Sequence, residues 1–426
     1  MKRRYDLLYA LGTLVSSPVL TYGLLRTGKW RTDWPGRLGR TPPVADDSRP
    51  TLLLHGVSVG EINATRKLVQ HLTRSGAPPV HLVVSATTDT GFDRARELYG
   101  RDHPVVRFPF DFSWMVRRFL DAVRPDAVAL MELEVWPNLA HACRTRGIPL
   151  AVINGRLSEK SFRRYRYVAR WVRPVFRTLS AVGAQTGKYA RRFRELGVPE
   201  ERVTVTDTMK WDTATITGEV EGSGALARAL GVERDQALVV AGSTGPGEEE
   251  MLLRTRPSGT QLMLVPRKPE RFDEVGRLAP GMVRRSLNPD GREGRGGELF
   301  LLDTMGELGK AYALADVAVV GRSFVPLGGS DPIEPVALGR PTVTGPYHEN
   351  FRDVVGAFRE RGGIRVTDEP MEVVKELLAR REVGREMAER GREVIRSRQG
   401  ATERTARLLY RLLGVEKGAK RKGQTP

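Results

Sequence analysis

The sequence predicts an α/β protein made of two doubly wound domains, each built on a parallel sheet. Three observations support this prediction: the length of 426 residues, short apolar runs separated by helix-like segments, and the recurrence of that pattern in both halves. One hydrophobic core rarely organises more than ~250–300 residues, so the length favours two domains. Ligands of such sheets bind beyond the carboxyl ends of the strands, and we therefore expect the domains to face a cleft that holds the site.

The short apolar runs mark the expected strands, because strands buried on both faces read as nearly continuous apolar segments. They lie at 51–55, 81–85, 127–131 and 150–154, and then, after a polar patch at 212–235, at 237–242, 261–265, 299–302, 317–320 and 341–344. No short period repeats, which excludes a solenoid. We expect Rossmann-like domains at 36–215 and 216–415, followed by a basic tail at 416–426.

Residues 1–35 form a predicted membrane-associated segment. Lys2, Arg3 and Arg4 precede a mostly apolar stretch at 7–25, which has roughly the ~20-residue length of a membrane span but contains serines and a proline. No small-residue cleavage site of a signal peptide follows. We expect a membrane anchor or an interfacial helix, and the alternative is a buried first helix of the domain.

The composition bears on partners and compartment. The formal net charge is +18, which gathers anions such as phosphates, anionic lipid or nucleic acid, although an arginine-rich solvated surface is the alternative reading. The single cysteine, Cys143, excludes an internal disulfide, and the absence of a Cys/His cluster argues against structural zinc. These features indicate a reducing, cytoplasmic environment.

Residues 162–177 alternate arginines with aromatic side chains. Such a segment can rest on anionic lipid, with its rings at the headgroup level and its cations on phosphates. The alternative is an amphipathic helix that packs its aromatic side chains inward. We find no nucleic-acid-binding module and no concentrated basic stripe, so we expect no nucleic-acid partner.

Candidate catalytic carboxylates follow two strands of the first half. Glu61 ends the motif HGVSVGE at the start of a helix, where it is either half of a capping box with Ser58 or a general base that the helix dipole keeps ionised. Glu132 and Glu134 come directly after the strand at 127–131. Two acids at this position indicate either a cleft site or an ion-paired strand end.

Turns of the second half are candidate donor-binding elements. The loop AGSTGPGEEE, which contains Ser243, can hold a phosphate on backbone amides, and VPRKPERF places Arg267, Lys268 and Arg271 where a phosphodiester would lie. Two further turns carry DTMGEL and GGSDPIEP. Glu334 in the latter can accept from ribose hydroxyls, and the alternative is a helix cap.

In order and spacing, the segments HGVSVGE, MELEVWPNL, INGRLSEKS, VPRKPERF, DTMGEL and SFVPLGGSDPIEPVALGRP resemble the 3-deoxy-D-manno-octulosonic acid (Kdo) transferases of lipopolysaccharide biosynthesis. The resemblance covers nearly the whole chain. It implies a GT-B-type glycosyltransferase that moves Kdo from CMP-Kdo to a lipid A precursor, lipid IVA, with inversion and without a metal or other cofactor. It also implies a location on the cytoplasmic face of the inner membrane.

The resemblance assigns Glu61 as the base and Glu132 and Lys210 as groups that stabilise the transition state. It places CMP on turns made by Pro266, Arg267, Met305, Gly306, Glu307, Asp331, Pro332, Ile333 and Glu334. The chain departs from the family pattern at Asp207, Lys268, Ser330 and Asp331, where Gly, His, His and Asn are usual. These departures leave another nucleotide-sugar transferase of the same fold as the alternative.

Overall fold

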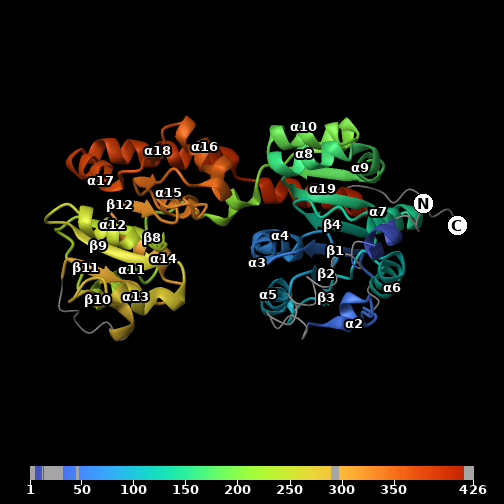
Figure 1. Cartoon of the computed structure of the whole chain (residues 1–426), viewed down its shortest axis with the longest axis horizontal. Coiled ribbons are helices and arrows are strands. Elements are labelled where there is room, and N and C mark those ends of the chain that lie inside the picture. Colours follow the sequence, from blue (N-terminus) through green and yellow to red (C-terminus); the bar gives the residue numbers. More distant parts are fainter. Residues whose placement is uncertain (1–4, 12, 14–31, 45–47, 289–296, 417–426) are drawn as a thin grey trace. The chain divides into compact units, whose positions relative to one another are not determined.

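The computed structural model describes residues 5–11, 13, 32–44, 48–288 and 297–416. Two compact units account for the chain: unit 1 comprises Met1–Asp212 together with Gln399–Pro426, and unit 2 comprises Thr213–Arg398. Each unit contains one parallel seven-stranded sheet. The prediction of two parallel α/β domains is therefore confirmed (Figure 1), whereas the cleft between them stays a prediction.

Unit 1 alternates strands and helices, as parallel pairing requires. Its strands are β1 (Thr51–Gly56), β2 (His81–Ala86), β3 (Val105–Arg107), β4 (Ala127–Met131), β5 (Leu150–Gly155), β6 (Ala181–Ala184) and β7 (Val203–Val205). Its helices are α2 (Trp34–Arg37), α3 (Val59–Ala64), α4 (Arg66–Thr73), α5 (Asp89–Tyr99), α6 (Ser113–Val123), α7 (Pro137–Arg146), α8 (Glu159–Tyr167), α9 (Ala169–Phe176), α10 (Gly187–Glu195), η2 (Glu200–Arg202), η3 (Met209–Thr213) and α19 (Ala401–Leu413).

The sheet of unit 1 has the strand order β3-β2-β1-β4-β5-β6-β7, so the order reverses beside β1, the first strand. Successive side chains of β1 enter opposite cores: Leu53 packs with the α6 and α7 side, and Leu52 and Leu54 pack with the α4 and α19 side. Ligands of doubly wound sheets bind at this switch point, outside the carboxyl ends of the strands. The turns after β1 and β4 are therefore the places to look for chemistry.

Unit 2 repeats the plan. Its strands are β8 (Leu238–Thr244), β9 (Gln261–Pro266), β10 (Val283–Arg284), β11 (Leu299–Leu301), β12 (Val317–Val320), β13 (Thr342–Thr344) and β14 (Arg365–Val366). Its helices are α11 (Ser223–Leu230), α12 (Glu248–Thr255), η4 (Pro269–Arg271), α13 (Phe272–Gly276), η5 (Arg285–Leu287), α14 (Leu308–Leu314), α15 (Ile333–Ala337), η6 (Glu349–Phe351), α16 (Arg352–Glu360), α17 (Pro370–Ala379) and α18 (Arg381–Arg398).

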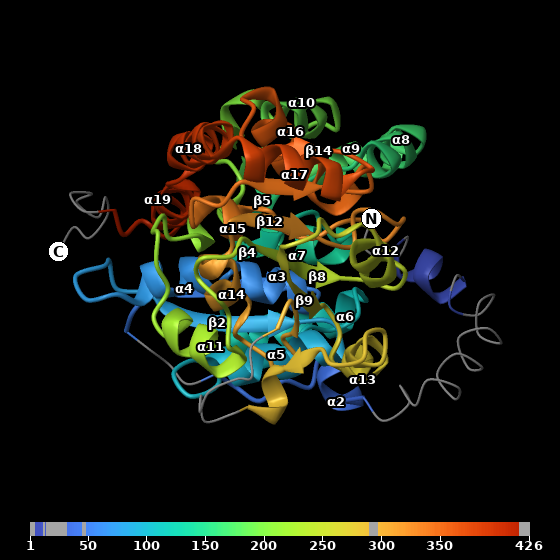
Figure 2. The same cartoon turned by 90° about the vertical axis from the view of Figure 1, so that its left-hand side faces the viewer.

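The second sheet has the order β10-β11-β9-β8-β12-β13-β14, with its first strand, β8, again at the centre. Helices α11 and α14 pack on one face, and α12, α13 and α17 pack on the other (Figure 2). Alternate side chains of β8 point to opposite faces of the sheet, since Val240 belongs to the first core and Val239 to the second. The carboxyl ends of β8, β9 and β12 thus share one edge of this sheet.

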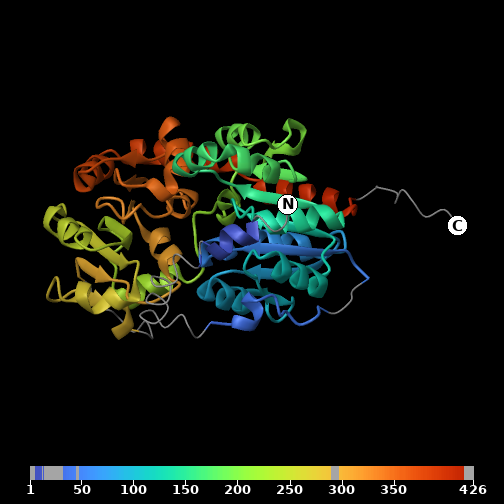
Figure 3. The ribbon, with the colours of Figure 1, turned by 45° about the vertical axis from the view of Figure 1, so that its right-hand side comes forward.

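The end of the chain departs from our predicted boundaries, which assigned 216–415 to the second domain. Helix α19 packs against α4 and the strands β4 to β6 of unit 1, as the red helix in Figure 3 shows. It contributes Leu408 and Leu409 to the core that contains Leu52 and Leu54. An amphipathic helix is placed by the face it buries, and sequence order does not reveal which sheet receives that face.

Most of the predicted N-terminal anchor lies outside the described residues. Within them, residues 5–11 are helical. None of the helices in the described ranges combines the length and the apolar character needed to cross a bilayer.

Candidate active site

Glu61 lies in the first turn of α3, directly beyond the carboxyl end of β1. Ser58 is the N-cap residue, and its side chain accepts from the Glu61 backbone N–H at 3.4 Å. The Glu61 carboxylate accepts from the Val57 N–H at 2.9 Å and from the Ser58 hydroxyl at 3.0 Å. The capping interaction is therefore present, and it also fixes the direction of a carboxylate that remains partly exposed.

Three carboxylates of unit 1 act on one another. Burial raises the pKa of Glu61, and the charge of Glu132 raises it further. Burial raises the pKa of Glu134 to about 7, again with contributions from Glu61 and Glu132. The structure thus brings together acids that follow the neighbouring strands β1 and β4. Acids whose pKa values are raised in this way are candidates for proton transfer near neutral pH.

Lys210 reaches the same edge of the sheet on η3, after the last strand. The backbone N–H of Met209, its neighbour, donates to Asn154 Oδ1 at the end of β5 at 3.3 Å. From the other side Arg404 of α19 donates to the Thr206 carbonyl at 3.1 Å and to the Asp207 carboxylate at 3.0 Å. The loop that carries Lys210 is therefore tied both to the sheet and to the final helix.

Strained backbone gathers at the carboxyl edges of both sheets. Among the described residues, six that are not glycine have positive φ, and five of them lie at or just after the end of a strand. The five are Glu132, Asn154, Asp207, Ser243 and Arg322. The left-handed region costs such residues about 1–2 kcal/mol each, and its use clusters at functional sites.

In unit 2 the turn after β9 leaves two of the three predicted cations exposed, Arg267 and Lys268, and buries the third, Arg271. Pro266 ends the strand, and Arg267 is exposed, with its backbone N–H donating to the Thr244 carbonyl at 3.0 Å. Arg271, which we expected beside Arg267 on the phosphate, is instead buried. It donates to Glu249 at 2.7 and 3.2 Å and to Glu274 at 2.6 Å. That part of the prediction is wrong because these carboxylates already satisfy the guanidinium.

The turn after β11 presents Met305, which is 67% exposed, and Gly306, whose φ of 84° suits glycine. The Glu307 side chain is half-buried and serves the turn itself, since it accepts from Thr304 at 2.6 Å and pairs with Arg285 and Lys310, each at 3.1 Å. Burial opposes ionisation of Glu307, but these three donors outweigh it and hold its pKa below the usual value. The carboxylate of Glu307 is therefore a brace of the turn.

Asp331, Ile333 and Glu334 line a cavity of about 440 Å³ together with the segment that begins unit 2. The Asp331 carboxylate accepts from the Ile333 N–H at 3.0 Å, and Pro332 completes the turn into α15. Glu334 is exposed, yet partial desolvation and the neighbouring Asp331 raise its pKa. A Cβ on Gly309 would lie 2.7 Å from the Glu334 carboxylate, so a larger residue at this position would displace that side chain.

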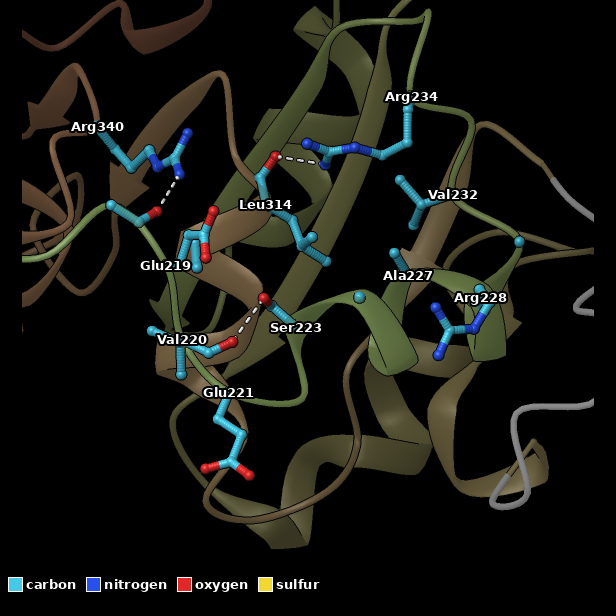
Figure 4. A pocket seen from close by; sticks show the side chains of 14 residues that line it. Glu219, Val220, Glu221, Ser223, Ala227, Arg228, Val232, Arg234, Leu314 and Arg340 are labelled. Atoms are coloured by element: carbon cyan, nitrogen blue, oxygen red, sulfur yellow. Dashed lines mark hydrogen bonds between the residues drawn. The ribbon is translucent and has the colours of Figure 1, made fainter.

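A larger cavity lies elsewhere, at the amino ends of β8, β12 and β13, with a volume of about 880 Å³. Figure 4 shows Arg234 and Arg340 at one end of it, with Val232, Ala227 and Leu314 lining its apolar part. Both arginines already donate to backbone carbonyls. Ligands of doubly wound sheets bind at the opposite edge, and residues that follow β11 and β12 line the smaller cavity at Asp331.

Sequence reasoning missed the roles of Glu248 and Asp212. We read the run of acids after Ser243 as a helix start that leaves amides free for phosphate, but the Gly245 N–H already donates to Glu248 at 2.8 Å. Asp212 accepts from Gly400 and Thr402 at the start of α19, at 2.7 and 2.5 Å. The signal for Glu248 was the acidic run itself, whereas nothing in the sequence links Asp212 to residues so far along the chain.

Comparison with known proteins agrees with this geometry. Residues 32–213 match the family model described as 3-deoxy-D-manno-octulosonic-acid transferase (kdotransferase). The 3-deoxy-D-manno-octulosonic acid transferase of Bordetella pertussis is 33% identical over 409 residues, which cover 91% of this chain and 93% of the relative. That of Haemophilus influenzae is 32% identical over 372 residues, covering 84% and 86%.

Solved structures show the same fold at low identity. Anabaena Alr3699/HepE in complex with UDP superimposes with a TM-score of 0.58 at 15% identity, covering 85% of this chain and 100% of that one. MurG of Acinetobacter baumannii gives a TM-score of 0.53 at 15% identity, covering 85% and 99%. These two likenesses identify a GT-B-type glycosyltransferase fold. Together with the whole-chain similarity to the curated relatives, they show that the chain belongs to the family of 3-deoxy-D-manno-octulosonic acid transferases.

Proposed function

We propose that the chain transfers Kdo from CMP-Kdo to lipid IVA, with unit 1 supplying the catalytic base and unit 2 the donor site. Kdo transfer in lipopolysaccharide biosynthesis follows from the family, and the finer assignments rest on the site. The observation that carries them is the oriented, partly exposed Glu61 carboxylate beside Glu132 and Glu134 at the switch point of the first sheet.

In this proposal the acceptor hydroxyl oxygen attacks the anomeric carbon of Kdo. The carbon–oxygen bond to the CMP phosphate breaks, CMP leaves with the electron pair, and the hydroxyl proton passes to Glu61. Attack and departure on opposite faces of that carbon invert its configuration. A positioned base of this kind contributes about 10²- to 10⁴-fold to the rate. Glu132 and Lys210 stabilise the transition state, and neither a metal nor another cofactor takes part.

Unit 2 binds the nucleotide in this scheme. The exposed guanidinium of Arg267 and the turn at Met305 and Gly306 receive the phosphate, and Glu334 accepts from the ribose hydroxyls in the cavity at Asp331. Ser243, with its left-handed backbone at the end of β8, borders the same edge. Asp331 lies where the family usually has Asn, so we expect it to influence the choice of donor.

We further propose that unit 1 rests on the anionic cytoplasmic face of the inner membrane. The helix at residues 5–11 turns its polar side to the protein, where Asp6 accepts from Ser113 and Asn138 and Tyr9 donates to Asp111. Its other side leaves Leu7, Leu8 and Leu11 at least 54% exposed. Exposed leucines on an amphipathic helix are suited to insertion at the headgroup level.

The segment 162–177 divides between our two readings. Phe162 and Phe176 are buried in the core of unit 1, as an inward-packing helix requires. Tyr167 and Trp171 are 94% and 52% exposed, and Arg163 is also exposed. The exposed aromatic and cationic side chains support contact with lipid, while the buried ones hold the segment to the sheet.

The test of the reaction is incubation of the purified chain with CMP-Kdo and lipid IVA, followed by mass spectrometry of the lipid. We expect the lipid mass to increase by whole Kdo units. Calorimetric titration should detect binding of CMP and none of UDP. Binding of UDP with an unchanged lipid would instead establish the alternative, another nucleotide-sugar transferase.

The membrane contact is tested separately with vesicles that contain anionic phospholipid. Replacing Leu7, Leu8 and Leu11 with serine should weaken vesicle binding, because each leucine contributes apolar area to insertion. Leu287→Ser is the matched control, since Leu287 is also an exposed leucine but lies in η5 of unit 2, away from this helix. Undiminished binding of the serine variant would reject the helix as the contact.

A further inference from the structure

Helix α12 begins with two carboxylates that are withdrawn from water. Glu248 and Glu249 are both 0% exposed, although they lie only one to two residues after the turn that ends β8. A buried carboxylate is costly unless several donors satisfy it. Glu249 is satisfied by the guanidinium of Arg271. Among the described residues no cation pairs with Glu248, and backbone N–H groups satisfy its carboxylate instead.

Four backbone N–H groups converge on Glu248. One carboxylate oxygen accepts from Gly245 at 2.8 Å and from Arg322 at 2.6 Å. The other accepts from Ser323 and Phe324, each at 2.9 Å. The side chain therefore joins the turn after β8 to the loop after β12, two neighbouring strands at the edge where we place the donor.

Close packing shows that this arrangement leaves little freedom. A Cβ on Gly321 would lie 2.6 Å from the Thr244 Cα and 2.9 Å from the Glu248 carboxylate. Arg322, the next residue, has a left-handed backbone with φ of 57°. A non-glycine residue holds that conformation only where its surroundings determine it, and here the Arg322 N–H is bonded to Glu248.

The ordered loop leads directly to the donor cavity. The Arg322 carbonyl accepts from the Gly329 N–H at 2.8 Å, and the Arg322 guanidinium donates to the Leu327 carbonyl at 3.0 Å. Gly329 is followed by Ser330 and by Asp331, which lines the cavity. Two successive hydrogen bonds and the chain from Gly329 to Asp331 thus connect Glu248 to the cavity, while Glu248 itself does not line it.

We propose that Glu248 is a positioning residue for donor binding, because it holds the loop from Arg322 to Gly329 in the conformation that presents Asp331 and Glu334 to the nucleotide. The proposal rests on the donor site assigned to unit 2. It makes Glu248 a determinant of affinity for CMP-Kdo without contact with the substrate.

The test is Glu248→Gln, which keeps the shape of the side chain but replaces one acceptor oxygen with an NH₂ group. Two of the four backbone N–H groups then lose their acceptor, and the loop has to shift to find water or another partner. We expect the Kd for CMP and the KM for CMP-Kdo to rise by about tenfold or more. The value of kcat at saturating CMP-Kdo should change much less, since Glu61 and its neighbours belong to unit 1.

The control is Glu250→Gln on the same helix, because Glu250 is exposed and its amide should leave Kd, KM and kcat as in the wild type. Thermal melts establish that each variant is folded at the assay temperature. Where Glu248→Gln melts too early, Glu248→Asp retains both oxygens and should give a smaller rise in Kd.

The outcomes distinguish failure of the proposed donor site from failure of the positioning role alone. A wild-type chain without affinity for CMP would remove the donor site and the positioning role together. Wild-type affinity for CMP in folded Glu248→Gln, or in folded Glu248→Asp when the amide does not fold, would remove the positioning role alone. If either folded variant binds CMP with wild-type affinity, Glu248 serves only the stability of the fold.

Discussion

The turns after the first strand of each sheet, at residues 56–61 and 242–248, end alike in a Gly-Glu pair that starts a helix, yet their glutamates differ. Glu61 accepts two hydrogen bonds and remains partly exposed. Glu248 accepts four and is 0% exposed. The comparison teaches that the number of donors and the access of water distinguish a carboxylate that can exchange a proton from one that braces the backbone.

The electrostatic surroundings of Glu61 and Glu248 also differ. Other carboxylates act on Glu61, so that burial and then the charge of Glu132 raise its pKa. Burial also raises the pKa of Glu248, but the four N–H groups that oppose it leave no room for a proton acceptor or donor from a substrate. Of Glu61 and Glu248, only Glu61 therefore combines a raised pKa with access to solvent.

The largest expected effect follows from replacing Glu61. Glu61→Gln removes the proposed proton acceptor, while the amide oxygen can still accept from the Val57 N–H and the amide NH₂ can donate to the Ser58 oxygen, so kcat should fall by about 10²- to 10⁴-fold. The Kd for CMP should stay at the wild-type value, because the nucleotide is assigned to unit 2. Steady-state kinetics and calorimetric titration measure the two quantities, and full turnover by Glu61→Gln would remove the base assignment.

The pH dependence of the wild type sharpens the same point. The base must be ionised to accept a proton, so kcat/KM should fall as the pH drops through the pKa of Glu61. Because that pKa is raised from its ordinary value of 4.5, the acidic limb should lie above pH 4.5. An acidic limb at or below the ordinary value would show that the ionisation of another group limits the reaction.

The fold was predictable from sequence where a strand is a continuous run of apolar residues that is buried on both faces. The expected runs at 51–55, 127–131 and 317–320 coincide with β1, β4 and β12 to within a residue. Some strands were not expected from the sequence, and each of them has only two to four residues: β3, β6, β7, β10 and β14. Length alone does not explain these misses, because β11, β12 and β13 are as short and were expected. The missed strands contain Arg, Gly or Thr and too few apolar residues to stand out from loops.

The site was predictable where it depends on a turn and not where it depends on a distant partner. The position of Glu61 after β1 follows from its own motif, and so does the turn at Gly306. The burial of Arg271 does not, because it depends on Glu249, which lies on another helix. Likewise α19 reaches unit 1 through contacts with Asp212, and sequence order alone does not indicate that return.

An effect of intermediate size is expected from a substitution that tests what holds the first turn of a helix in each unit. Helix α12 is organised by its own Glu248, whereas α19 begins at Gly400 without a side-chain cap of its own and relies on Asp212. Asp212→Ala should destabilise the start of α19 by about 1–2 kcal/mol, as loss of an N-cap does. Hydrogen exchange should become faster at 401–413 and remain unchanged at 248–255.

The exposed Asp235 offers the matched control, since Asp235→Ala removes the same charge from a surface loop. Exchange at 401–413 that is equally fast in both variants would show that packing of Leu408 and Leu409 alone secures α19. The proposed contrast, in which the distant Asp212 holds α19 whereas Glu248 holds its own helix α12, would then be wrong.

The smallest expected effect concerns the left-handed residues Asp207 in unit 1 and Ser243 in unit 2, whose φ values are 61° and 57°. Glycine relieves strain of about 1 kcal/mol at such a position but gives the unfolded chain nearly as much additional freedom. Ser243→Gly should therefore leave the melting temperature nearly unchanged. Asp207→Gly also loses the ion pair with Arg404, which is only partly exposed, and should cost up to about 1 kcal/mol.

Calorimetric melts of the two glycine variants and of Arg404→Ala measure this difference. If Arg404 offsets the strain at Asp207, then Arg404→Ala should cost less stability in the Asp207→Gly background than in the wild type, because the shared interaction is already absent. Equal costs in both backgrounds would mean that Arg404 acts through its bonds to the Thr206 and Gln399 carbonyls instead. The loop that carries Lys210 would then be held by its backbone, as Glu248 holds the loop from Arg322 to Gly329 in unit 2, and the two units would brace their strained turns in the same way.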